Sequence, residues 1–228
     1  MRKTSPATAG RRVRGADSDA RAQLLDAAVS LFAERGIANT TVARIAAAGR
    51  VTSAMVHYWF DTRERLLDAV VEERLAPLFR TIWEPADVEH GAPFELVQGV
   101  LSRMFDVTEK QPWLPSLWLR EIVNEGGLLR ERALRHIPSK RVAGFGQNIG
   151  RGMARGEVNA RIEPMLLFNS ILALVMLPQA TSRIWHRIHP GFKLDRVMLE
   201  RHVSALLMNG IAGPAAAAPA RRARRRTP

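Results

Sequence analysis

Apolar residues recur along this chain at the spacing of amphipathic helices. A first helix is predicted from about Ser18 to Arg35, and Gly36 ends it. No stretch alternates apolar and polar residues over the length of a strand, and no Asn-Gly or Asp-Gly hairpin signal occurs. We therefore predict an all-α fold. The inward face of the first helix is formed by Leu24, Leu25, Ala28, Leu31 and Phe32.

Glycine, proline and capping residues divide the remaining chain into further helices. Thr40 is expected to cap a short second helix that Gly49 closes, and Thr52 to cap a third that runs to about Phe60. A fourth helix begins at Asp61 or Thr62, and Pro77 should kink or end it. The later helices are predicted over residues 94–109, 112–124, 128–137, 138–155, 164–185 and 194–209.

The second and third predicted helices have the form of a helix-turn-helix. The second would bury small or branched residues, the turn contains Gly49, and Val51 fills the angle between the two helices. The third presents hydroxyls, an imidazole and small surfaces that allow it to approach base edges in a major groove. These residues are Thr52, Ser53, Ala54, Met55, His57 and Tyr58.

Charge is concentrated at the two ends of the chain. Of the formal net charge of +12, five positive charges lie in residues 1–16 and five in residues 213–228, which leaves the part between them near neutral. Such segments suit a polyanionic partner, or they are disordered ends that keep the protein in solution. Both interpretations stay open, so the high net charge is not the argument for DNA binding.

The absence of cysteine excludes a disulfide framework, thiolate zinc sites and thiol catalysis, and it fits a reducing cytoplasm. The basic N-terminus lacks the apolar run of a secretory signal, and the longest apolar run, Ile171–Pro178, is far short of a membrane span. We expect no membrane partner, no metal, no cofactor and no catalytic constellation.

Residues 21–71 resemble the N-terminal domain of the TetR family of bacterial repressors. The likeness rests on an A-x-x-L-F-A-E-R-G helix end, a T-T-V-x-x-I-A helix, and V-H-Y-W-F followed at once by a charged helix start. The resemblance implies a three-helix DNA-binding domain and a larger helical domain for ligand binding and dimerisation. The expected division is a disordered basic arm at 1–16, DNA-binding domain at 17–62, larger domain at 63–212 and disordered tail at 213–228.

The same resemblance assigns roles within the DNA-binding domain. Thr40 and Arg63 would contact phosphates, Tyr58 the DNA backbone, and Trp59 would pack or lie near a phosphate. The residues facing the bases would be Thr52, Ser53, Ala54, Met55 and His57. The family has glycine directly before the valine of the turn, whereas this chain has Arg50. Arg50 would therefore adopt a positive φ, or the turn would shift by one residue; it is also a candidate phosphate contact.

The larger domain offers two candidate surfaces. An apolar ligand pocket is one interpretation of its scattered aromatic residues, and an ordinary core is the other. The pocket residues would be Trp83, Met104, Phe105, Trp113, Trp118, Arg120, Asn124, Phe145 and Phe168. Two apolar helices would form the interface of a homodimer. The interface residues would be Leu167, Ile171, Leu174, Val175, Val197 and Leu206.

The sequence thus predicts a cytoplasmic, dimeric, sequence-specific regulator of transcription that is not an enzyme. It would bind a roughly palindromic DNA operator as a repressor and leave it when a small molecule binds. The alternative is an architectural protein that binds DNA without sequence preference through its arginine-rich tails. Equal affinity for random duplex and for DNA beside its own gene would favour the alternative.

Overall fold

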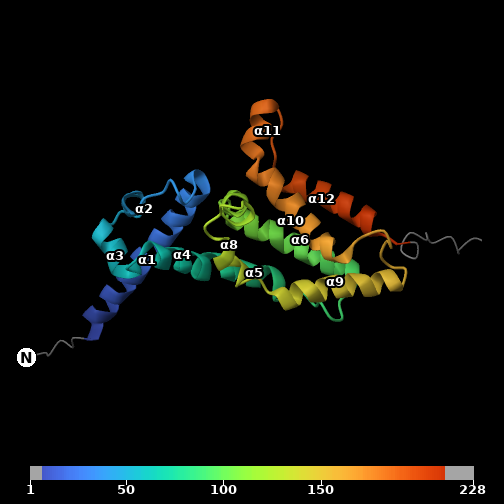
Figure 1. The fold of residues 1–228 in the computed structure, drawn as a ribbon, viewed down its shortest axis with the longest axis horizontal. Coiled ribbons are helices and arrows are strands. Elements are labelled where there is room, and N and C mark those ends of the chain that lie inside the picture. Colours follow the sequence, from blue (N-terminus) through green and yellow to red (C-terminus); the bar gives the residue numbers. More distant parts are fainter. Residues whose placement is uncertain (1–6, 214–228) are drawn as a thin grey trace, which may run out of the picture. The chain divides into compact units, whose positions relative to one another are not determined.

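Every regular element in the described part of the chain is a helix, which confirms the all-α prediction (Figure 1). The computed structural model describes residues 7–213, with side chains from residue 17 onward. The predicted tail therefore lies outside the described residues, apart from its first residue, Gly213, and so do the side chains of the predicted basic arm. The helices are α1 (Ala7–Arg35), α2 (Val42–Ala48), α3 (Ser53–Phe60), α4 (Arg63–Val70), η1 (Val71–Leu75), α5 (Ala76–Trp83), α6 (Pro93–Lys110), α7 (Leu114–Leu117), η2 (Trp118–Val123), α8 (Arg130–Leu134), α9 (Ser139–Ala154), α10 (Pro164–Ala180), α11 (Ser182–Ile188) and α12 (Arg196–Ile211).

The chain forms two compact units that interleave along the sequence. The first unit contains the chain up to Pro77 together with Ser116–His136, and the second contains Leu78–Pro115 and the chain from Ile137. This differs from the single boundary expected at residue 62. The difference arises because a segment from the middle of the chain packs on the N-terminal helices, a long-range contact that local sequence patterns do not reveal.

The first unit is built around the buried face of α1. Leu24, Leu25 and Phe32 are at most 1% exposed, and α2 and α4 both contact this helix. Val56 and Phe60 of α3 complete the core. Each fully buried side chain of this size contributes about 1.5–3 kcal/mol, so the three-helix arrangement follows from the apolar pattern. The α1 backbone is helical from Ala7, before the start expected near Ser18.

The helix that follows α3 passes Pro77 without ending there. It runs through α4, widens into the π-helical turn η1, and continues as α5 to Trp83. Proline has no N–H to donate and its ring crowds the preceding turn. A π turn directly before it relieves that clash, because its hydrogen bonds span one more residue.

In the second unit, α6 contacts α9, α10 and α12. Its inner face is fully buried and carries Leu96, Val97, Val100, Leu101, Met104 and Phe105. The amphipathic spacing predicted for residues 94–109 is thus confirmed by the burial of that face.

The long helix predicted over 164–185 is broken. It consists of α10 and α11, which are bent by 57° at Thr181. Pro178 interrupts the helical hydrogen bonds, and the Thr181 hydroxyl donates to the carbonyl of Leu177 at 2.7 Å. By length and composition, no single helix among the described residues qualifies as a membrane span; α10 and α11 qualify only when joined across their bend.

Candidate DNA-binding site

The start of α2 differs from the prediction by one residue. Thr41 is the N-cap, and its side chain accepts from the N–H of Arg44 at 3.3 Å. Thr40 is fully buried, and its hydroxyl donates to the carbonyl of Gly36 at 2.8 Å. The predicted phosphate contact of Thr40 is therefore corrected, because its hydroxyl is turned into the protein and fixes the α1–α2 turn.

The backbone of the turn between α2 and α3 shows which alternative holds for Arg50, a positive φ or a turn shifted by one residue. Arg50 has φ +57°, so it adopts the left-handed conformation, and its side chain is exposed. Gly49 has an ordinary φ of −78°. A Cβ on Gly49 would lie 2.8 Å from Cδ1 of the buried Leu24, so glycine is needed there for close approach to α1.

Helix α3 has one buried and one exposed side. Thr52 caps it by accepting from the N–H of Met55 at 3.3 Å, and Val56 and Phe60 are buried. Tyr58 is 76% exposed. Thr52, Ser53, Ala54, His57 and Tyr58 are exposed together, whereas Met55 and Trp59 are half-buried. The structure thus brings most of the predicted base-facing residues onto one accessible surface.

Arg63 has a different place from the one the resemblance implies. Its guanidinium donates to the carbonyl of Ile37, and the side chain is half-buried. It holds the α1–α2 turn, and its role as a phosphate contact stays a prediction. Two arginines that the sequence reasoning passed over are exposed near the reading head: Arg44 on α2 and Arg65 on α4.

Glu121 is a buried carboxylate within the same unit. It is 5% exposed and accepts from the N–H of Ile37 at 2.9 Å. The sequence reasoning gave it no role in the DNA-binding domain. One signal was present: Leu114, Leu117 and Glu121 have helical spacing, which places the carboxylate on an apolar face.

Three of the residues predicted to line a pocket, Trp83, Phe145 and Phe168, form a packed cluster in the second unit. The ring centroid of Trp83 lies 4.7 Å from that of Phe168 and 6.0 Å from that of Phe145. Met104 and Phe105 are buried in α6, and the Trp113 indole donates to Gln111. Three of the predicted residues are not brought to this cluster, because they group with the first unit: Trp118, Arg120 and Asn124.

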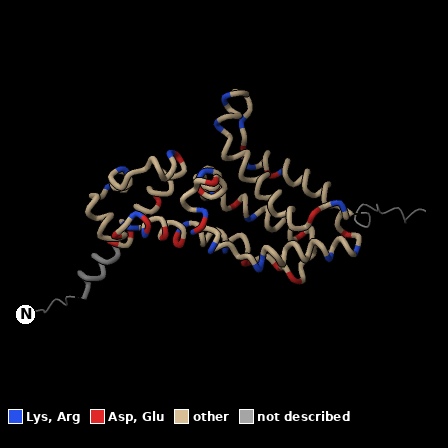
Figure 2. The backbone as a smooth tube through the Cα atoms, in the orientation of Figure 1, with Lys and Arg blue, Asp and Glu red and all other residues tan. Residues whose placement is uncertain are grey.

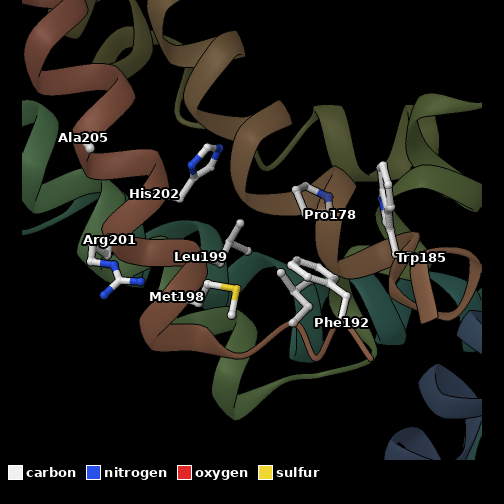
Figure 3. A pocket seen from close by; sticks show the side chains of 9 residues that line it. Pro178, Trp185, Phe192, Met198, Leu199, Arg201, His202 and Ala205 are labelled. Carbon is white, nitrogen blue, oxygen red and sulfur yellow. The ribbon is translucent and has the colours of Figure 1, made fainter. Parts of the chain in front are cut away.

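An open apolar groove of about 680 Å³ lies between the end of α10, α11 and α12 (Figure 3). Pro178, Trp185 and Phe192 line one side, and Met198 and Leu199 of α12 line the other. Arg201 and His202 stand at its edge. Among residues 17–213, no group of three or more His, Asp or Glu side chains is placed to hold a metal ion.

The predicted interface residues fall into two classes. Leu167, Ile171 and Val175 lie in the core of their own unit, at most 5% exposed, so their assignment to the interface is corrected. Within this unit, α10 contacts α9, α6 and α12. Leu174 is half-buried, whereas Val197 is 75% and Leu206 51% exposed. The outer faces of α10 and α12 carry the exposed apolar residues instead.

Comparisons with known proteins agree with this geometry. Residues 24–70 match the family described as bacterial regulatory proteins, tetR family. The HTH-type transcriptional regulator BetI of Paraburkholderia phymatum is 25% identical over 143 residues, 59% of this chain and 71% of the relative.

Solved structures show the same fold. The ketosteroid transcriptional regulator KstR2 of Mycobacterium tuberculosis is 21% identical with a TM-score of 0.67, over 84% of this chain and 94% of that one. FadR from Bacillus subtilis, in complex with stearoyl-CoA, is 21% identical with a TM-score of 0.63, over 84% and 99%. With the exposed α3, these findings show that residues 24–70 match the DNA-binding domain of the tetR family and that the chain has the fold of TetR-family transcriptional regulators.

Proposed function

We propose that this protein is a homodimeric repressor that reads a roughly palindromic operator with α3 and leaves it when a small molecule binds. The single observation that carries the DNA-reading role is the exposed face of α3, capped by Thr52 and anchored by buried Val56 and Phe60. A recognition helix must be fixed from behind and accessible in front, and α3 meets both conditions. Acting on bacterial DNA, the protein would work in the cytoplasm at the nucleoid and without catalysis.

The exposed residues of α3 and of the preceding turn would contact two different parts of the DNA, the base edges and the phosphates. Ser53 and His57 offer a hydroxyl and an imidazole to base edges, and Ala54 lets the helix approach the groove. Tyr58 and Arg50 would contact phosphates from the two ends of the surface. Thr52 would fix the start of α3 through its N-cap hydrogen bond. Met55 and Trp59, which are half-buried, would support the exposed face of α3.

Dimerisation would use the outer faces of α10, α11 and α12. Helix α10 contains no charged residue and is uniformly tan in Figure 2. Ile184, Ile188 and Val197 are each at least 58% exposed, and they lie on α11 and α12, the helices that also line the groove. Apolar area of this extent on a folded unit indicates a partner. We assign a second copy to it, because exposed apolar residues occur on all three helices.

This dimer has a direct test. Val197→Glu should convert the dimer to monomers in sedimentation or light-scattering measurements, because it places a charge in the proposed apolar contact. Leu134→Glu is the matched control, since Leu134 is 49% exposed on α8, outside this surface. An unchanged dimer in Val197→Glu would reject the assignment of α12 to the interface.

The effector would bind within the second unit. FadR binds stearoyl-CoA, which motivates an acyl-CoA as the first ligand to try. Trp83, Phe145 and Phe168 fill the space among α5, α9 and α10, so a ligand entering there must move these rings. Met104, Phe105 and Trp113 would line the same region from α6 and its end. Titration with a series of acyl-CoAs should then change tryptophan emission, and Trp83→Phe should reduce the change.

The DNA-binding experiment uses the full chain and two duplexes, one from beside its own gene and one shuffled. We expect affinity for the first to exceed that for the second by about 10³-fold or more, with two protected half-sites about 34 Å apart. Equal affinity for both duplexes would favour the architectural alternative. A panel of acyl-CoAs and other apolar metabolites that leaves operator binding unchanged would reject release by such ligands.

A further inference from the structure

The backbone of Ile37 is held from two directions in the first unit. Its N–H donates to Oε1 of Glu121 at 2.9 Å, and its carbonyl accepts from the Arg63 guanidinium. Ile37 lies in the turn between α1 and α2, and its side chain is fully buried. The peptide that leads into the helix-turn-helix is therefore tied both to the first residue of α4 and to η2.

The free energy of burying the Glu121 carboxylate opposes this contact. It is 5% exposed, its second oxygen accepts from the N–H of Leu128 at 3.2 Å, and no ion pair to it occurs among the described residues. Burial of a carboxylate without a cation is unfavourable. The site also lies just beyond the carboxyl end of α1, where the helix dipole disfavours an anion. Two backbone hydrogen bonds offset these costs, so the contact depends on the Ile37 and Leu128 N–H groups staying in place.

The element that carries Glu121 has an uncommon helical conformation. η2 is a π-helix, in which the N–H of Asn124 donates to the carbonyl of Leu119 at 3.2 Å. Arg130 donates to the carbonyl of Ile122 at 3.0 Å and so holds its end. Returning one such turn to α-helical hydrogen bonding rotates the neighbouring residues by about 100°, which would carry Glu121 away from Ile37.

The chain connects this element to the helices of the second unit. η2 follows α6 and α7 in the sequence and precedes α9, and α6 and α9 belong to the second unit. Arg132 of the same segment also pairs with Asp68 of α4 at 2.7 Å. A displacement of α6 or α9 is thus passed by covalent connection to the segment that holds the DNA-reading unit.

We propose that Glu121 is a positioning residue whose contact with Ile37 keeps the helix-turn-helix in its DNA-binding arrangement, and that a change in η2 releases it. This inference rests on the proposed function, because it names the contact through which a ligand would alter DNA affinity. Glu121 lies far from α3 in the sequence. Arg63 would stabilise the same arrangement, because its guanidinium donates to the carbonyl of Ile37.

The experiment compares full-length Glu121→Ala, Glu121→Gln and Glu125→Gln. Glu125 is an exposed glutamate of the same segment and serves as the matched control. Operator affinity should fall about tenfold in Glu121→Ala, within the roughly 5- to 150-fold range of allosteric coupling, and less in Glu121→Gln, which keeps one acceptor oxygen. Glu125→Gln should bind like the parent protein.

Hydrogen exchange supplies a measurement that a merely structural role would not change. By reciprocity, operator DNA should slow amide exchange in residues 118–128 of the parent protein and of Glu125→Gln but not of Glu121→Ala. If Glu121→Ala fails to fold, Glu121→Gln takes its place in this comparison. Operator affinity within twofold of the parent and unchanged protection by DNA in the Glu121 variant would overturn the proposal.

The outcome also separates this inference from the proposed function. If the parent protein binds no specific duplex, the proposed function fails by itself. Exchange of the Ile37 amide in the free protein still tests the contact, because Glu121→Ala should accelerate it and Glu125→Gln should not. Equal exchange rates in the two variants would reject the role of Glu121.

Discussion

Arg50 combines a strained backbone with a proposed DNA contact, and substitution separates the two. Its φ of +57° is a conformation that costs a non-glycine residue about 1–2 kcal/mol. Glycine removes this cost but adds conformational entropy to the unfolded chain, which offsets about 0.4–1 kcal/mol. Arg50→Gly should therefore stabilise the protein by about 0.5–1 kcal/mol.

DNA binding should change in the opposite direction. Loss of one arginine contact to a phosphate should weaken binding to all sequences and lower the slope of log affinity against log salt by about 1. Arg50→Ala is the control, because it removes the charge but keeps Cβ and hence the strain. Both variants should lose affinity equally, whereas only Arg50→Gly should gain stability.

The assays are urea unfolding, thermal unfolding and fluorescence anisotropy with a labelled operator at several salt concentrations. A gain of about 1 kcal/mol corresponds to a rise in Tm of roughly 2–8 °C, depending on the size of the unfolding unit. Equal stability of the glycine and alanine variants would refute the argument from strain. An unchanged salt slope would refute the phosphate contact.

Three further outcomes are expected. Thr52→Ala removes the cap of α3 and should lower the unfolding free energy by about 1 kcal/mol in urea unfolding, whereas an unchanged value would argue against the cap. The Arg21 guanidinium lowers the pKa of Glu73, so this pair stabilises the fold above the usual glutamate pKa of about 4.3 and loses its effect as the pH falls through the lowered value. Glu73→Gln should therefore flatten the acid limb of stability against pH, and a parallel curve would contradict the pairing. His57→Ala should change the preferred operator sequence, by about 1–3 kcal/mol at one base pair, in a binding-site selection; an unaltered preference would remove His57 from the reading surface.

Local patterns in the sequence were sufficient to locate the reading head. Capping by Thr52 predicted the start of α3, and its side chains predicted the exposed face, whereas the burial of Val56 and Phe60 was seen in the structure. The unusual φ of Arg50 was one of two predicted alternatives, because the glycine of the turn stands one residue early. The role of that glycine, a close approach to Leu24, needed the structure.

The sequence alone therefore determined the helical class, the helix-turn-helix and its exposed face, since these depend on residues a few positions apart. The tertiary structure decided what distant segments do to one another. It turned Thr40 and Arg63 inward, and buried Leu167, Ile171 and Val175 in their own unit. It also brought Glu121 to a peptide 84 residues earlier in the chain. Such contacts depend on how helices pack in three dimensions, and no local spacing records them.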